Sequence, residues 1–246
     1  MKIDRRFLKI DSEWNVVHLP EQPNGFAILI IGDRNHYVDE STSLWIQNPD
    51  RLQMLEMLRK KGYTIFYSNL YGRHWGSPKA VDLLIRFYQM LMRNEILNNK
   101  IHIIAEGMGA LAALKFVKKM DSSVRSIVMM SPCIDLKKYM EHEKVNKLFY
   151  KHLLKELSFA YDIEERFVEQ KVIKPFDVKY FTACQIPVKI CQSTNRISYN
   201  INDHGRMYER SCGQQSPISL TLHLFEKRFN ITQNIIKFLT QYEKVL

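Results

Sequence analysis

The sequence is short of the residues that staple small proteins or bind metals. Only four of its 246 residues are cysteine, and they lack the paired short spacing of a zinc site. A chain of this length can bury a full hydrophobic core and has no need of disulfides. We therefore expect reduced, mostly buried thiols, with no metal ion and no other cofactor. The four cysteines are Cys133, Cys184, Cys191 and Cys212.

Long apolar runs are also absent. No stretch reaches the roughly 20 apolar residues that a membrane-spanning helix needs. The first residues, MKIDRRFLKIDSEW, place charges where a signal peptide would carry its apolar core. We expect a cytoplasmic protein without a transmembrane segment.

Acidic residues are in the minority. Asp and Glu total 26 against 36 Lys and Arg, which gives a formal net charge of +10. An excess of this size favours nucleic acid, anionic lipid or an acidic partner. The lysines nevertheless lie in scattered pairs among acids, without an aromatic-interleaved stripe, so we expect a basic surface rather than a specific nucleic-acid site. These pairs are Lys60-Lys61, Lys118-Lys119 and Lys137-Lys138.

The periodicity of apolar residues predicts strands and helices in alternation. Residues 5–10 and 14–19 alternate apolar and polar side chains and predict an antiparallel hairpin. Continuous apolar runs typical of buried parallel strands follow, separated by apolar stripes at helical spacing. We therefore expect one α/β domain over residues 1–246, with a mostly parallel sheet and helices on both faces. The expected strands are 26–32, 63–70, 101–104, 124–130, 186–191 and 218–225, and the expected helices are 50–61, 81–92, 111–117 and 231–242.

The segment Lys100–Met120 contains a very tight turn between a buried strand and a helix of small residues. The turn reads AEGMGA from residue 105 to residue 110, and its small residues let the helix begin almost on top of the strand end. It resembles the nucleophile elbow of the α/β-hydrolase fold, G-x-S-x-G, whose central residue has a strained backbone. Gly107 occupies that position, so no nucleophilic side chain is present there. Glycine also relieves strain of roughly 1–3 kcal/mol.

The resemblance covers the order of elements along nearly the whole chain, and it implies two further catalytic positions. In that family an acid follows a late strand and a histidine follows the last one. A hydroxyl needs an imidazole to take its proton, and the imidazole needs a carboxylate to fix its tautomer. Here the acid position is Arg196, or Asn195 with a one-residue shift, and the histidine position is Asn230. None of the three can do this chemistry.

Two other residues are candidates for displaced catalytic groups. Asp135 follows the expected strand at 124–130, where some family members place their acid, although a turn or helix cap also explains it. His204 lies in the polar stretch 192–217 and would need an unusual loop path to reach the elbow. His223 falls inside the last strand pattern, so we interpret it as a strand side chain.

The resemblance also implies an oxyanion hole. Backbone donors need no particular side chain, so such a hole can persist without a triad. It would be formed by Met108 N–H and the loop that begins at Asp33 and Arg34. Glu106 and Gly107 complete the predicted pocket.

Hydrolases of this family insert a lid at the place where residues 137–182 lie. This segment is helical in pattern and mixed in charge, with an apolar face that includes Val145, Leu148 and Phe149 together with later leucines. It predicts either a lid that covers a pocket or an amphipathic pair of surface helices.

These observations predict a catalytically inactive α/β-hydrolase-like protein, a pseudohydrolase. We expect it to bind a small acyl or carbonyl ligand in the pocket, or a protein partner through the lid and the basic surface. The alternative is an active esterase or thioesterase with displaced machinery built on Asp135 and His204.

Overall fold

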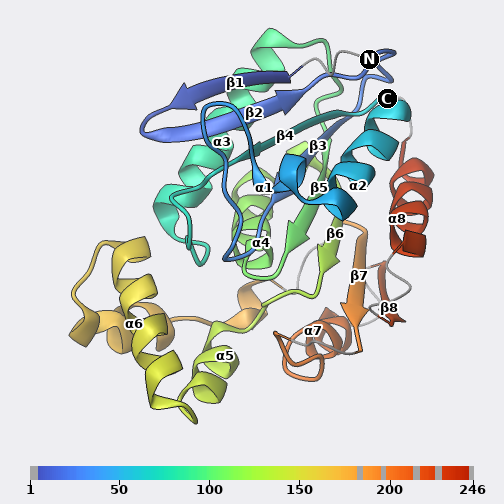
Figure 1. The fold of residues 1–246 in the computed structure, drawn as a ribbon. Coiled ribbons are helices and arrows are strands. Elements are labelled where there is room, and N and C mark those ends of the chain that lie inside the picture. The colour runs from blue at the N-terminus through green and yellow to red at the C-terminus, as the bar shows by residue number, and fades with distance from the viewer. Residues whose placement is uncertain (1–4, 182–184, 195–197, 213–216, 225–228, 244–246) are drawn as a thin grey trace.

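A computed structural model of the chain describes residues 5–181, 185–194, 198–212, 217–224 and 229–243. The described strands form a single sheet (Figure 1). They are β1 (Arg5–Ile10), β2 (Glu13–His18), β3 (Ala27–Ile31), β4 (Thr64–Ser68), β5 (Ile101–Glu106), β6 (Val124–Met130), β7 (Val188–Ser193) and β8 (Ile218–His223).

The sheet has eight strands in the order β1-β2-β4-β3-β5-β6-β7-β8. β1 and β2 form the predicted antiparallel hairpin, and β2 pairs with β4 in antiparallel register. The pairs from β4 through β3 and β5 to β8 are all parallel. The prediction of a mostly parallel sheet with a leading hairpin is therefore confirmed.

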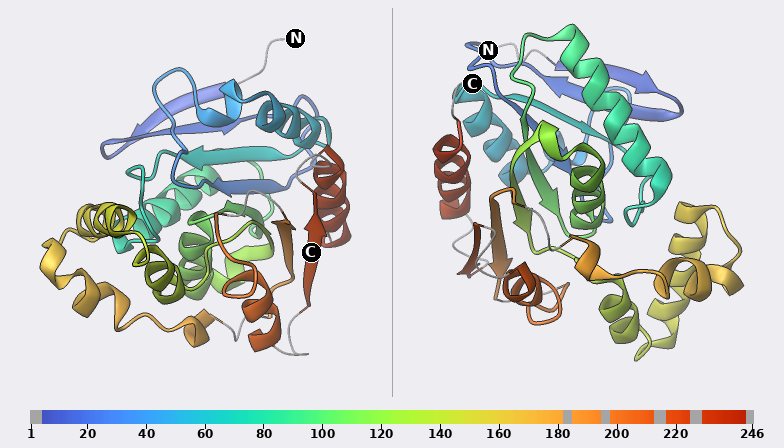
Figure 2. Two further views of the ribbon diagram at one scale, coloured as in Figure 1. Left: turned by 60° about the horizontal axis from the view of Figure 1, so that its bottom comes forward. Right: turned by 180° about the vertical axis from the view of Figure 1, so that it is seen from behind.

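Helices cover both faces of this sheet (Figure 2). They are α1 (Leu44–Gln47), α2 (Pro49–Lys60), α3 (Pro78–Asn94), α4 (Gly109–Met120), α5 (Leu136–Glu143), α6 (Lys147–Tyr161), α7 (Gly205–Cys212) and α8 (Phe229–Gln241). α3, α4 and α7 pack on one face, and α2 and α8 pack on the other with α1 beside them. The parallel strands are thus buried on both sides, which explains their continuous apolar sequence.

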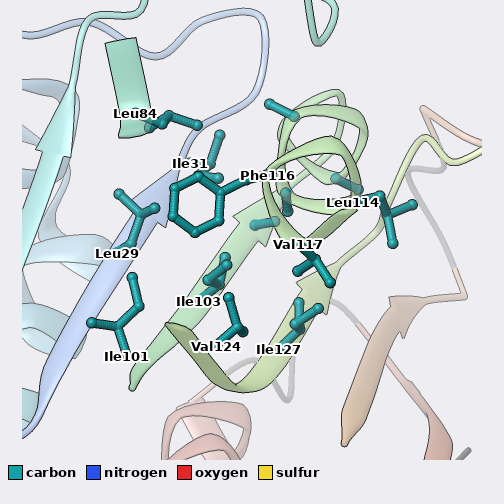
Figure 3. Packing of buried hydrophobic residues seen from close by; sticks show 14 of the residues in the cluster. Leu29, Ile31, Leu84, Ile101, Ile103, Leu114, Phe116, Val117, Val124 and Ile127 are labelled. Carbon is teal, nitrogen blue, oxygen red and sulfur yellow. The ribbon is translucent and has the colours of Figure 1, made fainter. Parts of the chain in front are cut away.

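Successive side chains of the central strands point to opposite faces. Leu29 and Ile103 pack under α3 and α4, and Figure 3 shows the Phe116 ring of α4 facing them. Their neighbours Ile30 and Ile104 pack toward α2 and α8. The carboxyl ends of β3, β5, β6 and β7 consequently meet along one edge, where the loops that follow them come together.

The predicted lid segment is helical in the structure. After α5 and α6 it continues in short helical turns, η2 (Glu165–Phe167), η3 (Glu169–Ile173) and η4 (Val178–Phe181). Its buried side chains, among them Leu153 and Leu157, share one hydrophobic cluster with Trp75 and Met108 beside the elbow. The limits of a separate lid within a single domain stay a prediction.

The predicted apolar face of this segment is wrong in one respect. Leu153 and Leu157 are buried, but Val145, Leu148 and Phe149 are exposed. The reason is that these three lie in the turn before α6 and in its first turn, beyond the contact with the rest of the protein.

The polar stretch 192–217, expected to be a loop, contains α7. This helix has few apolar residues, but Tyr208 and Cys212 lie one helical turn apart and are both buried against the face that α3 and α4 cover. Two such side chains are enough to hold a short helix in tertiary contact, and they were too few to give a readable apolar stripe.

Candidate functional site

The turn after β5 has the geometry of an elbow. Gly107 has a left-handed backbone with φ of +49°, and α4 begins two residues later. Gly107 N–H donates to Met130 O (3.0 Å), and Gly107 O accepts from Cys133 N–H (2.9 Å), which ties the turn to the end of β6. At Gly109 an added Cβ would lie 2.4 Å from Ile31 O. The small residues of this turn are therefore required by its close approach to β3.

The space above Gly107 is filled by the side chain of Asp33. A Cβ built on Gly107 would lie 2.1 Å from Asp33 Cγ. Asp33 Oδ1 accepts the backbone N–H of Met108 at 2.9 Å and the hydroxyl of Tyr199 at 2.9 Å. This corrects the predicted oxyanion hole, because its Met108 donor is engaged by a carboxylate of the same chain. Asp33 contributes a side-chain acceptor at this position.

Aromatic side chains and Arg34 close over this carboxylate. Arg34 Nη1 donates to the hydroxyl of Tyr139 on α5 (3.0 Å), and its guanidinium lies 5.9 Å from the ring centroids of both Tyr139 and Tyr199. Tyr139 in turn stacks on Trp75, with centroids 5.2 Å apart. Burial raises the pKa of Tyr199 well above its ordinary value, so its hydroxyl stays protonated and donates to Asp33.

Glu106, the last residue of β5, is buried and paired with a cation. Arg51 of α2 donates to both of its carboxylate oxygens, at 3.1 and 3.3 Å, while the guanidinium lies 5.9 Å from the ring centroid of Trp45. Burial raises the pKa of Glu106, and Arg51 opposes that rise. The pair fixes the start of α2 to the edge of the sheet beside Gly107.

A cavity of about 360 Å³ lies beside the elbow. Among the residues that the structure describes, its lining holds three carboxylates, from Asp33, Asp50 and Glu106, and one guanidinium, from Arg51. Its other lining residues include Trp45, Met54, Gly107, Tyr199, His223 and Ile231. The described part of the lining is thus partly aromatic and holds more carboxylates than guanidinium groups.

The two candidates for displaced catalytic groups have structural roles. The Asp135 carboxylate accepts Lys138 N–H (3.1 Å) as the N-cap of α5, which confirms the interpretation as a helix cap. His204 Nδ1 accepts the backbone N–H of Ile134 (3.3 Å) and of Asp135 (3.2 Å). Burial lowers the pKa of His204 to about 4. His204 is therefore neutral, and the lone pair that a general base needs is already engaged, so this geometry does not support a catalytic role for the predicted Asp135–His204 pair.

The remaining positions of the predicted triad can be placed only in part. Asn195 and Arg196 lie outside the described residues. Asn230 lies in the first turn of α8, but its side chain is not among those described. His223 is the last residue of β8, which agrees with a strand position, and it lines the cavity beside Gly107.

The other described histidines in the interior are neutral groups of the core. Burial lowers the pKa of His18, His36 and His102 to about 3 in each case, and that of His74 to about 4. His102 Nδ1 lies 2.8 Å from Ser126 Oγ, but both side chains are buried between β5 and β6. This imidazole–hydroxyl pair has no access to a substrate.

Within the described ranges, no cluster of three or more histidine, cysteine, aspartate or glutamate side chains could hold a metal ion. Cys133, Cys191 and Cys212 are buried free thiols, as predicted, whereas Cys184 lies outside the described residues. Burial raises the pKa of Cys133, the cysteine beside the elbow, well above its ordinary value. No helix in the described part of the chain combines the length and the apolarity needed to cross a bilayer.

Sequence reasoning placed Asp33, Glu106 and Gly107 in the pocket, but it missed the contacts that define the site. Gly107 follows from the motif, but the side chain of Asp33, the hydroxyl of Tyr199 and the Arg51 partner of Glu106 do not. The one available signal for Asp33 was a carboxylate placed directly after the β3 strand, whose end must adjoin the elbow in a parallel sheet.

No protein-family model and no curated protein matches this sequence. The fold, in contrast, matches those of solved structures along nearly the whole chain. Est1E from Butyrivibrio proteoclasticus superposes with a TM-score of 0.69 and 13% identity, over 97% of this chain and 98% of that chain. The esterase Pf2001 from Pyrococcus furiosus superposes with a TM-score of 0.65 and 14% identity, over 98% of this chain and 93% of that chain. A puromycin-hydrolyzing peptidase from Mycobacterium tuberculosis superposes with a TM-score of 0.75 and 13% identity, over 98% of this chain and 39% of that chain.

Identities this low bear on the fold alone. The fold they share with this chain agrees with the order of its strands, the helices on both faces and the tight turn after β5. The chain therefore has the α/β-hydrolase fold.

Proposed function

We propose that this chain is a catalytically inactive protein of the α/β-hydrolase fold that acts by binding. The observation that carries the proposal is the position of the Asp33 carboxylate. It takes the space into which a side chain at position 107 would project, and it accepts the Met108 N–H that would otherwise stabilise an oxyanion. The site thus has no attacking atom at the elbow and carries a negative charge where a transition state needs donors.

No described histidine is hydrogen-bonded to the elbow in a position to act as its base. The side chain of His223, which lines the cavity, contacts Leu224 O (3.3 Å) instead. A general base needs a free lone pair and a pKa near the working pH. His204 uses its Nδ1 lone pair on two backbone N–H groups, and burial lowers its pKa to about 4. A hydroxyl placed at the elbow would therefore remain a weak nucleophile.

The cavity beside Gly107 is the proposed ligand site. Its volume of about 360 Å³ suits a small organic molecule. An acyl or carbonyl ligand would have to displace Asp33 from Met108 N–H in order to be bound as in a hydrolase. Carboxylates outnumber guanidinium groups among the described lining residues, and Asp33 forms no described ion pair. This favours a ligand with a positive charge, and Trp45 and Tyr199 add aromatic surface for it. We infer that the ligand is a small organic cation.

Inactivity is tested with a panel of short p-nitrophenyl esters and a fluorophosphonate probe. The proposal predicts no turnover above buffer and no covalent label on the purified chain. Saturable labelling or ester hydrolysis that is abolished by His223→Ala would overturn it, because His223 is the described histidine that lines the cavity. Hydrolysis lost on His204→Ala would instead restore the displaced-triad alternative.

The charge of the ligand is tested with probes of matched shape. Benzylamine, benzyl alcohol and benzoate are titrated against the protein by NMR, and we expect binding in that order. Asp33→Asn keeps an acceptor for Met108 N–H and removes the charge, so it should weaken benzylamine by about fivefold or more. Asp82→Asn, on the outer surface of α3, is the control and should change nothing. Preferred binding of benzoate would refute the cation assignment without reviving catalysis.

A further inference from the structure

The turn between α5 and α6, together with the first turn of α6, exposes three apolar side chains at one end of the molecule. The exposed fractions are 90% for Val145, 68% for Leu148 and 58% for Phe149. We call these three residues the apolar tip. In Figure 1 the turn lies at the opposite end of the molecule from the β1–β2 hairpin. Exposed apolar groups gathered at one place, unlike scattered single ones, mark a surface that meets another phase or molecule.

The apolar tip is held in place and does not serve the core. The Asn146 side chain caps α6 by accepting the backbone N–H of Leu148 (3.0 Å) and of Phe149 (3.4 Å). The face of α6 that packs on the protein is a different one, formed by Leu153, Leu157 and Ala160. The tip is therefore presented to solvent by an ordered helix start.

Lysines adjoin the apolar tip along α6, in a stretch bounded by Glu143 and Glu156. From Lys144 to Lys155 the sequence KVNKLFYKHLLK has four lysines and no acid. Lys144 pairs with Glu169 (2.8 Å), whereas Lys147, Lys151 and Lys155 are exposed on α6. Apolar side chains at a protruding turn, with cations along the adjoining helix, match the two components of an anionic bilayer surface.

We propose that the apolar tip docks this protein on anionic lipid bilayers. Val145, Leu148 and Phe149 enter the boundary between headgroups and acyl chains, while the lysines of α6 remain at the level of the anionic headgroups. A stable protein–protein interface needs a complementary area of about 1,000 Å² or more, which three side chains do not offer by themselves. Insertion into a fluid surface needs no such complementarity. This proposal does not depend on the ligand of the cavity.

The test is co-sedimentation of the purified full chain with sucrose-loaded vesicles. Vesicles of phosphatidylcholine with about 30% phosphatidylserine should retain the protein, and vesicles of phosphatidylcholine alone should not. Phe149→Ser should weaken retention by about fivefold or more. The matched control is Ile96→Ser, because Ile96 is 100% exposed and stands alone after α3. It should leave retention unchanged.

A second pair of variants separates a lysine-specific effect from general basicity. Lys147→Gln with Lys151→Gln should weaken retention by about fivefold per lysine. Lys60→Gln with Lys61→Gln removes the same charge at the end of α2 and should have little effect. Absence of retention on the anionic vesicles would overturn the proposal, as would retention that responds equally to both lysine pairs. A concentration-dependent dimer that Phe149→Ser abolishes, without vesicle binding, would identify a second copy as the occupant and would also overturn it.

Discussion

Replacing Gly107 by alanine tests directly whether Asp33 fills the space above the elbow. The new Cβ would lie 2.1 Å from Asp33 Cγ and 2.2 Å from its Oδ1. A left-handed backbone costs a residue with a Cβ about 1–2 kcal/mol, and overpacking of this kind costs about 1–3 kcal/mol. We therefore expect Gly107→Ala to lower the free energy of unfolding by about 2–5 kcal/mol.

Asp33→Ala provides the second side of a double-mutant cycle. Alone it removes an acceptor from Met108 N–H and from the Tyr199 hydroxyl, at a cost of about 2 kcal/mol for a half-buried carboxylate. In the double variant, Asp33→Ala also removes the atoms that the new Cβ would strike. Gly107→Ala then adds only the backbone cost of position 107 to the cost of losing Asp33. The double variant should be more stable than the sum of the two single effects by about 1–3 kcal/mol.

Urea unfolding of the wild type, the two single variants and the double variant, followed by tryptophan fluorescence, measures this coupling. The comparison requires equal m values, the slopes of unfolding free energy against urea concentration. Additivity within about 0.5 kcal/mol would mean that Asp33 does not occupy the space above Gly107, and the central reasoning would fail. Gly109→Ala supplies the control, because its Cβ would strike the backbone at Ile31 O, 2.4 Å away. Asp33→Ala should give it no relief.

Three further outcomes follow from the site and the core. Gly107→Ser should give no ester hydrolysis, alone or with Asp33→Ala, in a p-nitrophenyl acetate assay; turnover in either would contradict the absence of a poised base. Burial lowers the pKa of His204 to about 4, below the unfolded value, so its contribution to stability is complete above about pH 6.5 and is lost as the pH falls toward 4. Between pH 7 and pH 5 the wild type should lose about 2 kcal/mol more unfolding free energy than His204→Asn, and equal losses by urea titration would refute this. Glu106→Gln, which leaves Arg51 without its carboxylate, should cost about 1–3 kcal/mol in the same assay, whereas no change would mean that the pair is not formed.

The fold was predictable from the sequence because its parallel strands are covered on both sides. The run FAILIIG at residues 26–32 is apolar without alternation, which few other environments require. The helix α7 was not predicted because few apolar residues hold it against the sheet, with Tyr208 and Cys212 buried and Met207 partly buried. The exposure of the apolar tip was not predicted either. Periodicity locates an apolar stripe on a helix, but it does not show where the surface that packs against the stripe ends.

The candidate site was predictable only where its cause is local. Gly107 could be assigned from the spacing of small residues in one turn. Asp33 and Tyr199 reach the same point from other strands, and their contacts depend on loop paths that sequence patterns do not encode. The helix cap made by Asp135 was readable for the opposite reason, because its partner Lys138 lies in the next turn of the chain.

The glycine at position 107 and the carboxylate of Asp33 make sense only as a pair. A side chain at 107 cannot coexist with Asp33 where it stands, and without Asp33 the Met108 N–H would again be open to a ligand oxygen. Catalysis would therefore require at least a hydroxyl at 107, a displaced Asp33 and a base with a free lone pair, because each alone leaves the others missing. The cavity beside them shares Asp33 and Gly107 with the elbow. Its other walls come from α1, α2, β5 and α8, which is why we propose that the fold can hold a ligand there without any reaction at the elbow.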